Sequence, residues 1–539
     1  MKIQYSKYNF FIYFFILSIL SILYFFFMGF KNMNCILLEV DLMMINSLNF
    51  MFILFIDWVS LIFSFLVLFI SLVIIIYSKD YLGEECNRFL YLMLLFVLFM
   101  LIMIYSPSIL GVILGWDGLG ISSYCLVVYY QSKDSFNSGF ITAASNRLGD
   151  TFLILSIISN LLNQNFMFWG ITETYLFFFI LACFTKSAQF PFSAWLPAAM
   201  AAPTPISSLV HSSTLVTAGV YMMVRFNYLL MKSNLFSFVM LISMITIFMA
   251  GVACFQEFDL KRIVAFSTLG QLGFMMMILS MGFSYVSFLH LLVHALFKVL
   301  LFMCVGVFIH YGEWQDIRSM GNMNLNLILK ISFLISNFSL MGLSFSSGFY
   351  SKDILLEVAY CSYSGYLFSF FLYLMVFLTV SYSVRMLKFL MMKNYWILWN
   401  ESGQILQSVM VISLINIFIG AILNWLILEN LNLIVMNKLI KLIPLLMIFF
   451  SLIWEGILNS IFLVYFSNMI YLSSLTKSVG MVYLFMYKTS KLLDQGWLEM
   501  VLLMLKNLIL LFSFWLKNFI LNSSMFMILG LIFLMILLV

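Results

Sequence analysis

The stretch YVSFLHLLVHALFKVLLFMCVGVFIH, residues 285–310, decides the class of this protein. It is apolar for longer than the about 20 residues that a helix needs to cross a hydrocarbon core, yet it contains His290, His294 and Lys298. At about 100° per residue the three side chains lie on one helical stripe about 80° wide, with steps of about 6 Å along the axis. Ionisable groups inside a membrane helix are costly and mark paths for protons or ions. Because histidine titrates near neutral pH, we interpret the stripe as a proton path.

The rest of the chain has the same apolar composition. Of its 539 residues 64% are hydrophobic and 9% are charged, whereas soluble proteins have about 25% charged residues. We therefore predict an all-α integral membrane protein with about sixteen transmembrane helices. The predicted segments are 10–28, 50–77, 89–105, 108–130, 141–162, 172–190, 206–228, 235–255, 262–281, 285–310, 327–343, 353–376, 377–392, 408–428, 443–468 and 520–539.

The charge and the cysteines exclude several function classes, and the amino-acid composition indicates an origin. The net charge of +5 is spread over short loops, which fits membrane topology and gives no nucleic-acid patch. The seven cysteines are far apart and form no C-x-x-C motif, so we expect no zinc or iron–sulfur ligation. The chain has 61 Phe and 40 Met but 6 Pro. Because Phe and Met have AT-rich codons and Pro has GC-rich codons, this bias favours an AT-rich genome such as that of an organelle. The first apolar segment is too long for a signal peptide, so we read it as a membrane helix.

Two segments interrupt the apolar pattern. The segment 191–205 holds four of the six prolines, and 344–353 reads SFSSGFYSKD. Proline breaks helices, and broken helices at membrane depth occur where they are buried or line a cavity. Two such interruptions are typical of transporters that are built from inverted repeats.

Further ionisable residues lie near these interruptions and inside other apolar segments. They are Asp117, Arg147, Asp150, Lys186, Lys352 and Asp353. Arg147 and Asp150 are three apart on one helix face, which favours a structural ion pair. Snorkelling or structural pairing is the alternative for the others, but a functional role is favoured for Asp117, Lys186 and Lys298 taken together. Among the remaining histidines, His211 follows the proline-rich segment among hydroxyl residues and joins the predicted path, whereas His310 ends its segment and reads as structural.

Seven motifs place the chain close to a known family. They are ILGWDGLGISSYCLV (113–127), NRLGD (146–150), TKSAQFPFSAWLPAAMAAPTPISSLVHSSTLVTAGVY (185–221), DLKRIVAFSTLGQLGFM (259–275), FLHLLVHALFKVLLFMCVG (288–306), QDIRSMG (315–321) and GFYSKD (348–353). Together they resemble the chain 5 family of NADH–ubiquinone oxidoreductase, the antiporter-like subunits at the far end of the membrane arm of respiratory complex I.

The resemblance implies a fold and a mechanism. The fold is two inverted five-helix repeats, each with a broken helix, and the mechanism couples proton translocation to electron transfer in a distant peripheral arm. In this family Asp117 looks like the carboxylate that pairs with Lys186, although the family usually has Glu there. Because Asp is shorter, that distance is either longer or bridged by water. The implied path runs from Lys186 through His211, the two stripe histidines and Lys298 to the pair Lys352–Asp353.

The resemblance also implies surroundings. No cofactor is expected in this chain, because FMN, the iron–sulfur clusters and ubiquinone belong to other subunits. The expected partners are other membrane-arm subunits of complex I, especially the antiporter-like chain 4, together with phospholipids and no nucleic acid. The expected location is the mitochondrial inner membrane, with the gene in the mitochondrial genome.

The C-terminal region carries a pattern of its own. The residues Lys488, Lys491, Gln495, Glu499, Lys506, Ser513 and Lys517 all fall within an arc of about 80° on a regular helix. A narrow polar stripe over this length predicts one helix of roughly 44 Å that lies along the membrane plane, although a hydropathy plot favours a span. The predicted domains are N-terminal helices (1–107), a first repeat (108–255), a second repeat (256–392), additional helices (393–475), the lateral helix (476–518) and a final span (519–539).

Two other functions fit the residues less well. A stand-alone cation/proton antiporter of the Mrp type would use the same buried groups, but the codon bias and the lateral helix favour a subunit of complex I. A structural membrane scaffold with vestigial charges would tolerate neutralisation of those charges without functional loss.

Overall fold

The computed structural model describes residues 9, 12–23, 35–45, 48–162, 173–320, 326–362, 366–391, 403–427, 438–453 and 472–521. The chain forms two compact units, Met1–Ile470 and Tyr471–Val539, which are described separately. The predicted final span lies outside the described residues, apart from its first two positions. Parts of the predicted spans 10–28 and 443–468 lie outside them as well.

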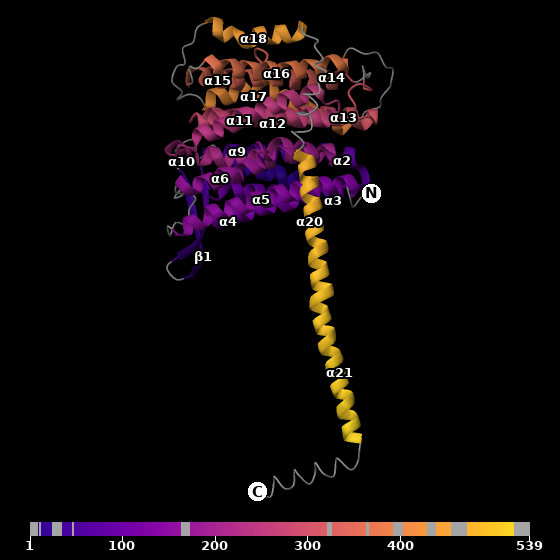
Figure 1. The fold of residues 1–539 in the computed structure, drawn as a ribbon. Helices are drawn as coiled ribbons and strands as arrows, with labels where there is room; N and C mark the ends of the chain where they lie inside the picture. The colour runs from indigo at the N-terminus through magenta and orange to yellow at the C-terminus, as the bar shows by residue number, and fades with distance from the viewer. Residues whose placement is uncertain are drawn as a thin grey trace. The chain divides into compact units, whose positions relative to one another are not determined.

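Two buried helices form the centre of the first unit. Helix α12 (Leu260–Ser280) and helix α13 (Ser284–Gly312) are joined by a tight turn at Gly282, whose φ of +92° favours glycine. The most apolar 18-residue window of each helix is buried along its whole length. Helix α13 packs against α14, α15, α17 and the segment η5, so residues far apart in sequence meet along it (Figure 1).

The other elements of the first unit surround this pair. In chain order they are β1 (Ile36–Ile45), β2 (Leu48–Ile56), α2 (Trp58–Leu82), η1 (Gly83–Glu85), α3 (Cys86–Tyr105), α4 (Ile109–Val127), α5 (Lys133–Leu162), α6 (Glu173–Lys186), η3 (Phe192–Ala194), α7 (Trp195–Ala198), η4 (Ala199–Ala201), α8 (Thr204–Ile206), η5 (Ser207–Thr214), α9 (Leu215–Arg225), α10 (Asn227–Lys232), α11 (Phe236–Gln256), α14 (Leu327–Met341), α15 (Ser347–Ser362), α16 (Tyr366–Met391), α17 (Gly403–Ile427) and α18 (Lys438–Ile453).

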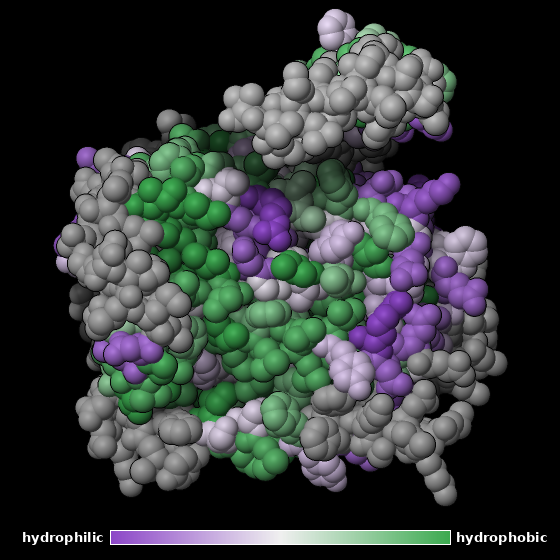
Figure 2. Space-filling model, turned by 90° about the horizontal axis from the view of Figure 1, so that it is seen from below, coloured by the Kyte–Doolittle hydropathy of each residue, from purple (hydrophilic) through white to green (hydrophobic). Residues whose placement is uncertain are grey.

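The helical membrane fold is confirmed. Within the described residues, eight helices are long and apolar enough to cross a membrane, and six shorter apolar helices accompany them. Large apolar side chains such as Leu241, Phe418 and Trp425 remain exposed on the outer faces of these helices. Figure 2 shows one face of the molecule, on which hydrophobic side chains cover a broad area and hydrophilic ones gather in separate patches. Such a surface is stable in contact with lipid, because apolar side chains can face the lipid tails directly.

A β-hairpin is the exception to the all-helical prediction. Strands β1 and β2 pair antiparallel, with Ile36 opposite Ile56, in a region where a span was predicted to begin at residue 50. The membrane helix α2 begins only at Trp58, because the Asp57 carboxylate accepts a hydrogen bond from the Ser60 amide at 3.1 Å and so caps it. Hydropathy alone does not separate a short apolar strand from a helix, which explains the early start that we predicted.

Both predicted interruptions are present. Between α6 and α9 the chain breaks into the short helical pieces η3, α7, η4 and α8, and then into the π-helix η5. The second interruption is shorter than predicted: α14 ends at Met341, and α15 already begins at Ser347. Lys352 and Asp353 therefore lie in the first two turns of α15 rather than in an irregular segment.

The second unit is one long helical run. Helix α20 (Leu472–Lys491), the π-helical segment η6 (Leu492–Leu498) and helix α21 (Glu499–Leu521) follow one another without a break (Figure 1). The predicted continuity of 488–517 is thus confirmed. The predicted single stripe needs a correction, because a π-helical turn has more residues than an α-helical one. It rotates Lys488 and Lys491 relative to the stripe positions in α21.

Candidate functional site

The first buried lysine closes helix α6. Lys186 is fully buried, and its Nζ donates a hydrogen bond to the Trp116 carbonyl oxygen of α4 at 3.2 Å. The same Nζ lies 5.1 Å from the centre of the Trp116 indole ring, within the range of a cation–π interaction. Gly219 of α9 lets the helices approach here, since a Cβ on it would lie 2.5 Å from the Cys183 carbonyl oxygen.

A carboxylate–arginine group lies next to this lysine. Arg147 Nη1 contacts Asp150 Oδ2 at 3.1 Å and Asp117 Oδ2 at 3.9 Å. The predicted Arg147–Asp150 ion pair is therefore confirmed. The expected pairing of Asp117 with Lys186 takes another form: in the part of the chain that the structure describes, Asp117 contacts Arg147, while Lys186 contacts the carbonyl of the residue before Asp117. The side chains of Asp117 and Arg147 are 40% and 58% exposed.

His211 lies in the π-helix η5. Its side chain is buried, its ring centre lies 6.1 Å from that of Trp195, and neither ring nitrogen has a hydrogen-bond partner within the described protein. The surrounding hydroxyls donate to carbonyls of their own helix, as Thr214 Oγ1 does to Leu209 O at 2.7 Å. Single π-helical turns occur frequently at functional sites.

The stripe on α13 faces the protein interior, as a proton path requires. His290, His294 and Lys298 are each at most 1% exposed. Lys298 Nζ donates to Ser267 Oγ of α12 at 2.5 Å. The ring centres of His290 and His294 are 6.3 Å apart, and both nitrogens of His294 lack a partner among the described residues.

His290 joins the stripe to α15. Its Nε2 lies 3.0 Å from Gln271 Oε1 of α12, and its Nδ1 lies 2.9 Å from Ser351 Oγ. Ser351 immediately precedes Lys352. Along the stripe, therefore, it is His290 rather than Lys298 that contacts the α15 end, whereas the expected path passed from Lys298 to Lys352.

Lys352 and Asp353 are neighbours in sequence but have different surroundings. Lys352 Nζ donates to Thr379 Oγ1 at 2.9 Å and to the carbonyls of Met341 at 3.4 Å and Leu340 at 3.5 Å. The last carbonyls of α14 thus receive a cation at the negative end of that helix.

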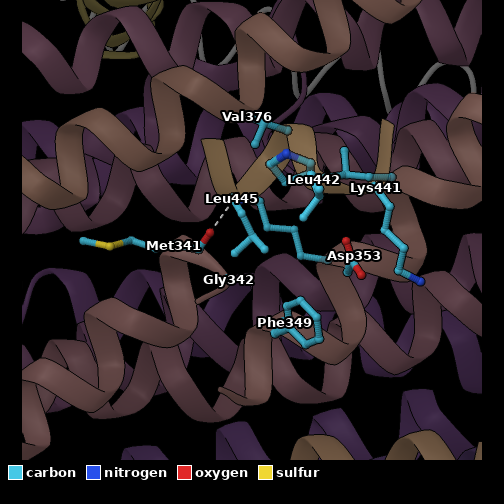
Figure 3. Close-up of a pocket in the computed structure, with 11 residues that line it drawn as sticks. Met341, Gly342, Phe349, Asp353, Val376, Lys441, Leu442 and Leu445 are labelled. Atoms are coloured by element: carbon cyan, nitrogen blue, oxygen red, sulfur yellow. Dashed lines mark hydrogen bonds between the residues drawn. The ribbon is translucent and has the colours of Figure 1, made fainter. Parts of the chain in front are cut away.

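Asp353 lines a cavity of about 350 Å³ between α14, α15, α16 and α18, together with Lys352 and Lys441 (Figure 3). Most of the lining is apolar, with Phe349, Leu356 and Leu445 among its residues. Lys441 of α18 forms an ion pair with Glu357, one turn beyond Asp353, at 2.6 Å. The Lys441 side chain is 57% exposed, so this group connects the buried Lys352 to the surface of the described residues.

Sequence reasoning missed the side chains that contact the buried lysines and histidines, and it missed the ion pair beside the cavity. These are Ser267, Gln271, Ser351, Glu357, Thr379 and Lys441. A signal was present for two of them, since Ser267 and Gln271 are polar residues four apart inside an apolar segment. Among the described residues, no group of three or more His, Cys, Asp or Glu side chains is arranged to hold a metal ion.

Comparisons with known proteins identify related families and chains. Residues 106–380 match a family model described as NADH:quinone oxidoreductase/Mrp antiporter, and residues 42–90 match one described as the N-terminus of complex I chain 5. The chain is 42% identical over 504 residues to NADH-ubiquinone oxidoreductase chain 5 of Aedes aegypti, covering 86% of this chain and 85% of that one. It is 41% identical over 528 residues to the Anopheles gambiae protein of the same name, covering 90% of each.

Two solved structures share the fold. A chain of an archaeal membrane-bound sulfane sulfur reductase superposes with a TM-score of 0.68 at 19% identity, over 77% of this chain and 89% of that one. A chain of the Mrp complex from Dietzia superposes with a TM-score of 0.61 at 20% identity, over 93% of this chain and 57% of that one. At these identities the likeness concerns the fold alone.

Proposed function

This chain belongs to the NADH-ubiquinone oxidoreductase chain 5 family, and from that premise we propose how its buried groups move protons. It is a proton-translocating subunit of the membrane arm of respiratory complex I. The observation that supports a proton path best is the row of fully buried cationic and imidazole groups on α6, η5, α13 and α15. Such groups are costly inside a membrane protein, and they typically mark paths for protons or ions.

The path begins at Lys186 and ends at the α15 cavity. A proton held on Lys186 passes by way of His211 to Lys298, then along His294 and His290 to Lys352. This order follows the His290–Ser351 contact, which brings the stripe to the residue before Lys352. The ring nitrogens of His211 and His294, which have no hydrogen-bond partner among the described residues, are suited to water-mediated transfer, because buried polar atoms require hydrogen bonds.

Asp117 controls Lys186 through charge rather than through direct contact. Arg147 lies between Asp117 and Asp150, so the charge on Asp117 contributes to the net charge of this trio beside Lys186. A change of one charge close to a buried cation alters the stability of that cation strongly, because the surroundings have a low dielectric constant. This trio is the element that would sense events in the rest of the complex.

The cavity at Asp353 is the exit. Lys352 lies on its buried side, and Lys441, which is largely exposed, lies with Asp353 on its lining. A proton released by Lys352 would reach Asp353 and then the Glu357–Lys441 pair.

The chain has no cofactor of its own in this proposal. The electron transfer that its family name describes belongs to other subunits, which hold FMN, iron–sulfur clusters and ubiquinone. The chain acts as part of that enzyme, without redox chemistry in its own residues.

The face of α4 and α5 is proposed to contact the neighbouring membrane-arm subunit, chain 4. Asp117 and Arg147 lie near the middle of their helices and are partly exposed among apolar residues such as Leu114 and Leu148. A charge exposed to lipid at that depth costs roughly 2.5–3.5 kcal/mol, so a protein partner fits this face better than lipid does. Phospholipids would cover the apolar faces, and the membrane would be the inner membrane of mitochondria, whose genome would encode the chain.

Two measurements separate this function from the alternative of a stand-alone Mrp-type antiporter. On a native gel of solubilised membranes, this chain should migrate in a large assembly that oxidises NADH. In that assembly, Lys298→Met should lower the number of protons translocated per NADH oxidised. A small complex without NADH oxidation would contradict the proposal.

A further inference from the structure

The two contacts of His290 are arranged for more than one charge state. Gln271 Oε1 is an acceptor, so Nε2 of His290, at 3.0 Å, carries a hydrogen and donates it. In the neutral ring Nδ1 is then an acceptor, and the Ser351 hydroxyl, at 2.9 Å, donates to it. Both ring nitrogens are satisfied in this state.

The same atoms also satisfy a charged ring. Ser351 Oγ lies 3.3 Å from the carbonyl oxygen of Gly348, three residues earlier in α15. If the hydroxyl hydrogen turns to that carbonyl, Ser351 Oγ becomes an acceptor for a second hydrogen on Nδ1. His290 is then an imidazolium that donates from both nitrogens, and no heavy atom has to move.

The neighbouring histidine lacks these partners. His294 is one turn further along α13 and equally buried, but neither of its nitrogens has a protein partner within the described residues. The two histidines of the stripe therefore differ: the protein is built to hold a charge on His290 and leaves His294 without such support.

We propose that His290 is the proton-holding histidine of the stripe, and that Gln271 and Ser351 are the positioning residues that make its charged state accessible. Gln271 fixes the tautomer by accepting from Nε2. In the direction of the path, the Nδ1 proton of charged His290 passes to Ser351 Oγ, while the hydroxyl gives its own proton, which had pointed to Gly348, towards neutral Lys352. The new O–H bond then turns back to Nδ1, so the hydroxyl stays neutral and one proton leaves the ring for α15. Reversal of these steps charges the ring again.

This inference rests on the proposed proton path and adds a role for two residues that bear no charge. It also gives a role to Ser351, the residue before Lys352. Among the described contacts, this serine is the only α15 residue that contacts a stripe histidine. A charged imidazolium is sensitive to a lost acceptor, because hydrogen bonds to charged groups are the stronger ones.

The test uses the assembled complex with variant chains, reconstituted in lipid vesicles, and measures protons translocated per NADH oxidised. Ser351→Ala removes the acceptor for Nδ1–H and should reduce proton transfer through this chain about tenfold or more. Ser351→Thr keeps the hydroxyl and should restore the transfer. If Ser351 had a packing role alone, the hydroxyl of the threonine would not restore what Ser351→Ala loses. Gln271→Leu should act like Ser351→Ala.

Ser347→Ala is the matched control. Ser347 is a buried serine one turn earlier in α15, but its hydroxyl lies 2.8 Å from Asn416 Oδ1 rather than near a histidine. It should keep normal pumping. If Ser351→Ala and Gln271→Leu pump normally while Lys298→Met does not, the inference is wrong and the proton path stands. If Lys298→Met also pumps normally, the proposed path itself fails.

Discussion

The amine of Lys186 donates a hydrogen bond to the main-chain carbonyl oxygen of Trp116 at 3.2 Å, and it lies 5.1 Å from the centre of the same residue's indole ring. A main-chain carbonyl and an aromatic face stabilise a cation less than an ionised carboxylate does. The protonated state of Lys186 therefore depends on charges that lie further away, on Asp117, Arg147 and Asp150. This arrangement suits a group that has to release its proton.

Replacement of Lys186 by Met should leave the complex assembled but remove most of the proton pumping that this chain supports. Methionine fills a similar volume without a charge, so packing is retained. Protons translocated per NADH oxidised is the quantity to measure, after assembly has been checked on a native gel. Lys232→Met, at an exposed lysine on α10, is the control and should have no effect. Normal pumping by an assembled Lys186→Met complex would contradict the role of this lysine.

Variants of Asp117 should separate charge from side-chain size. Asp117→Glu keeps the carboxylate and extends its reach towards Arg147, so we expect pumping to be retained. Asp117→Asn removes the charge but leaves the Arg147–Asp150 ion pair at 3.1 Å, so the complex should assemble and pump poorly. The same pumping measurement checks both variants. Equal pumping by Glu and Asn at this position would show that the charge of Asp117 does not control Lys186.

The sequence predicted the helical membrane fold and the interior stripe because both follow from local spacing. His290, His294 and Lys298 repeat every four residues, and apolar runs of helical length surround them. The partners of these groups come from other helices, as Ser351 and the Trp116 carbonyl do, and no local pattern indicates which helices meet. Hydropathy missed the β-hairpin before α2, since it does not separate a short apolar strand from a helix. The polar-stripe argument missed the π-helical turn η6, since it assumed a regular α-helical period.

The ion pair between Asp57 and Arg225 should be important for stability. It joins the N-terminus of α2 to the end of α9, and the two side chains are only 13% and 12% exposed. Asp57→Asn keeps a residue that can cap α2 but leaves the Arg225 charge without its partner, which typically costs about 3–5 kcal/mol. Thermal unfolding of the purified complex, followed through this subunit, should show an earlier transition for the variant. Lys133→Gln, at an exposed lysine at the start of α5, is the control and should unfold like the wild type. An unchanged transition for Asp57→Asn would mean that the pair contributes little.

The C-terminal helical run should matter for assembly before it matters for proton transfer. Glu499, Lys506, Ser513 and Lys517 share a narrow face of α21, while large apolar side chains such as Leu503, Ile509 and Phe512 are exposed around it. A helix of this kind fits along neighbouring subunits and lipid. Removal of residues 471–539 should weaken assembly of the membrane arm, as seen by loss of the large species on a native gel. A fully assembled arm without this segment would contradict a role of the helical run in assembly.

Lys298 provides the most direct test of the proton path, because it is fully buried, lies at the centre of the unit and has Ser267 as its hydrogen-bond partner. The decisive measurement is the number of protons translocated per NADH oxidised by assembled complex that carries Lys298→Met in sealed vesicles. Our account predicts a clear fall relative to the wild type, with NADH binding and assembly intact. A value equal to that of the wild type would show that the buried charges are structural and that the proton path does not run through them.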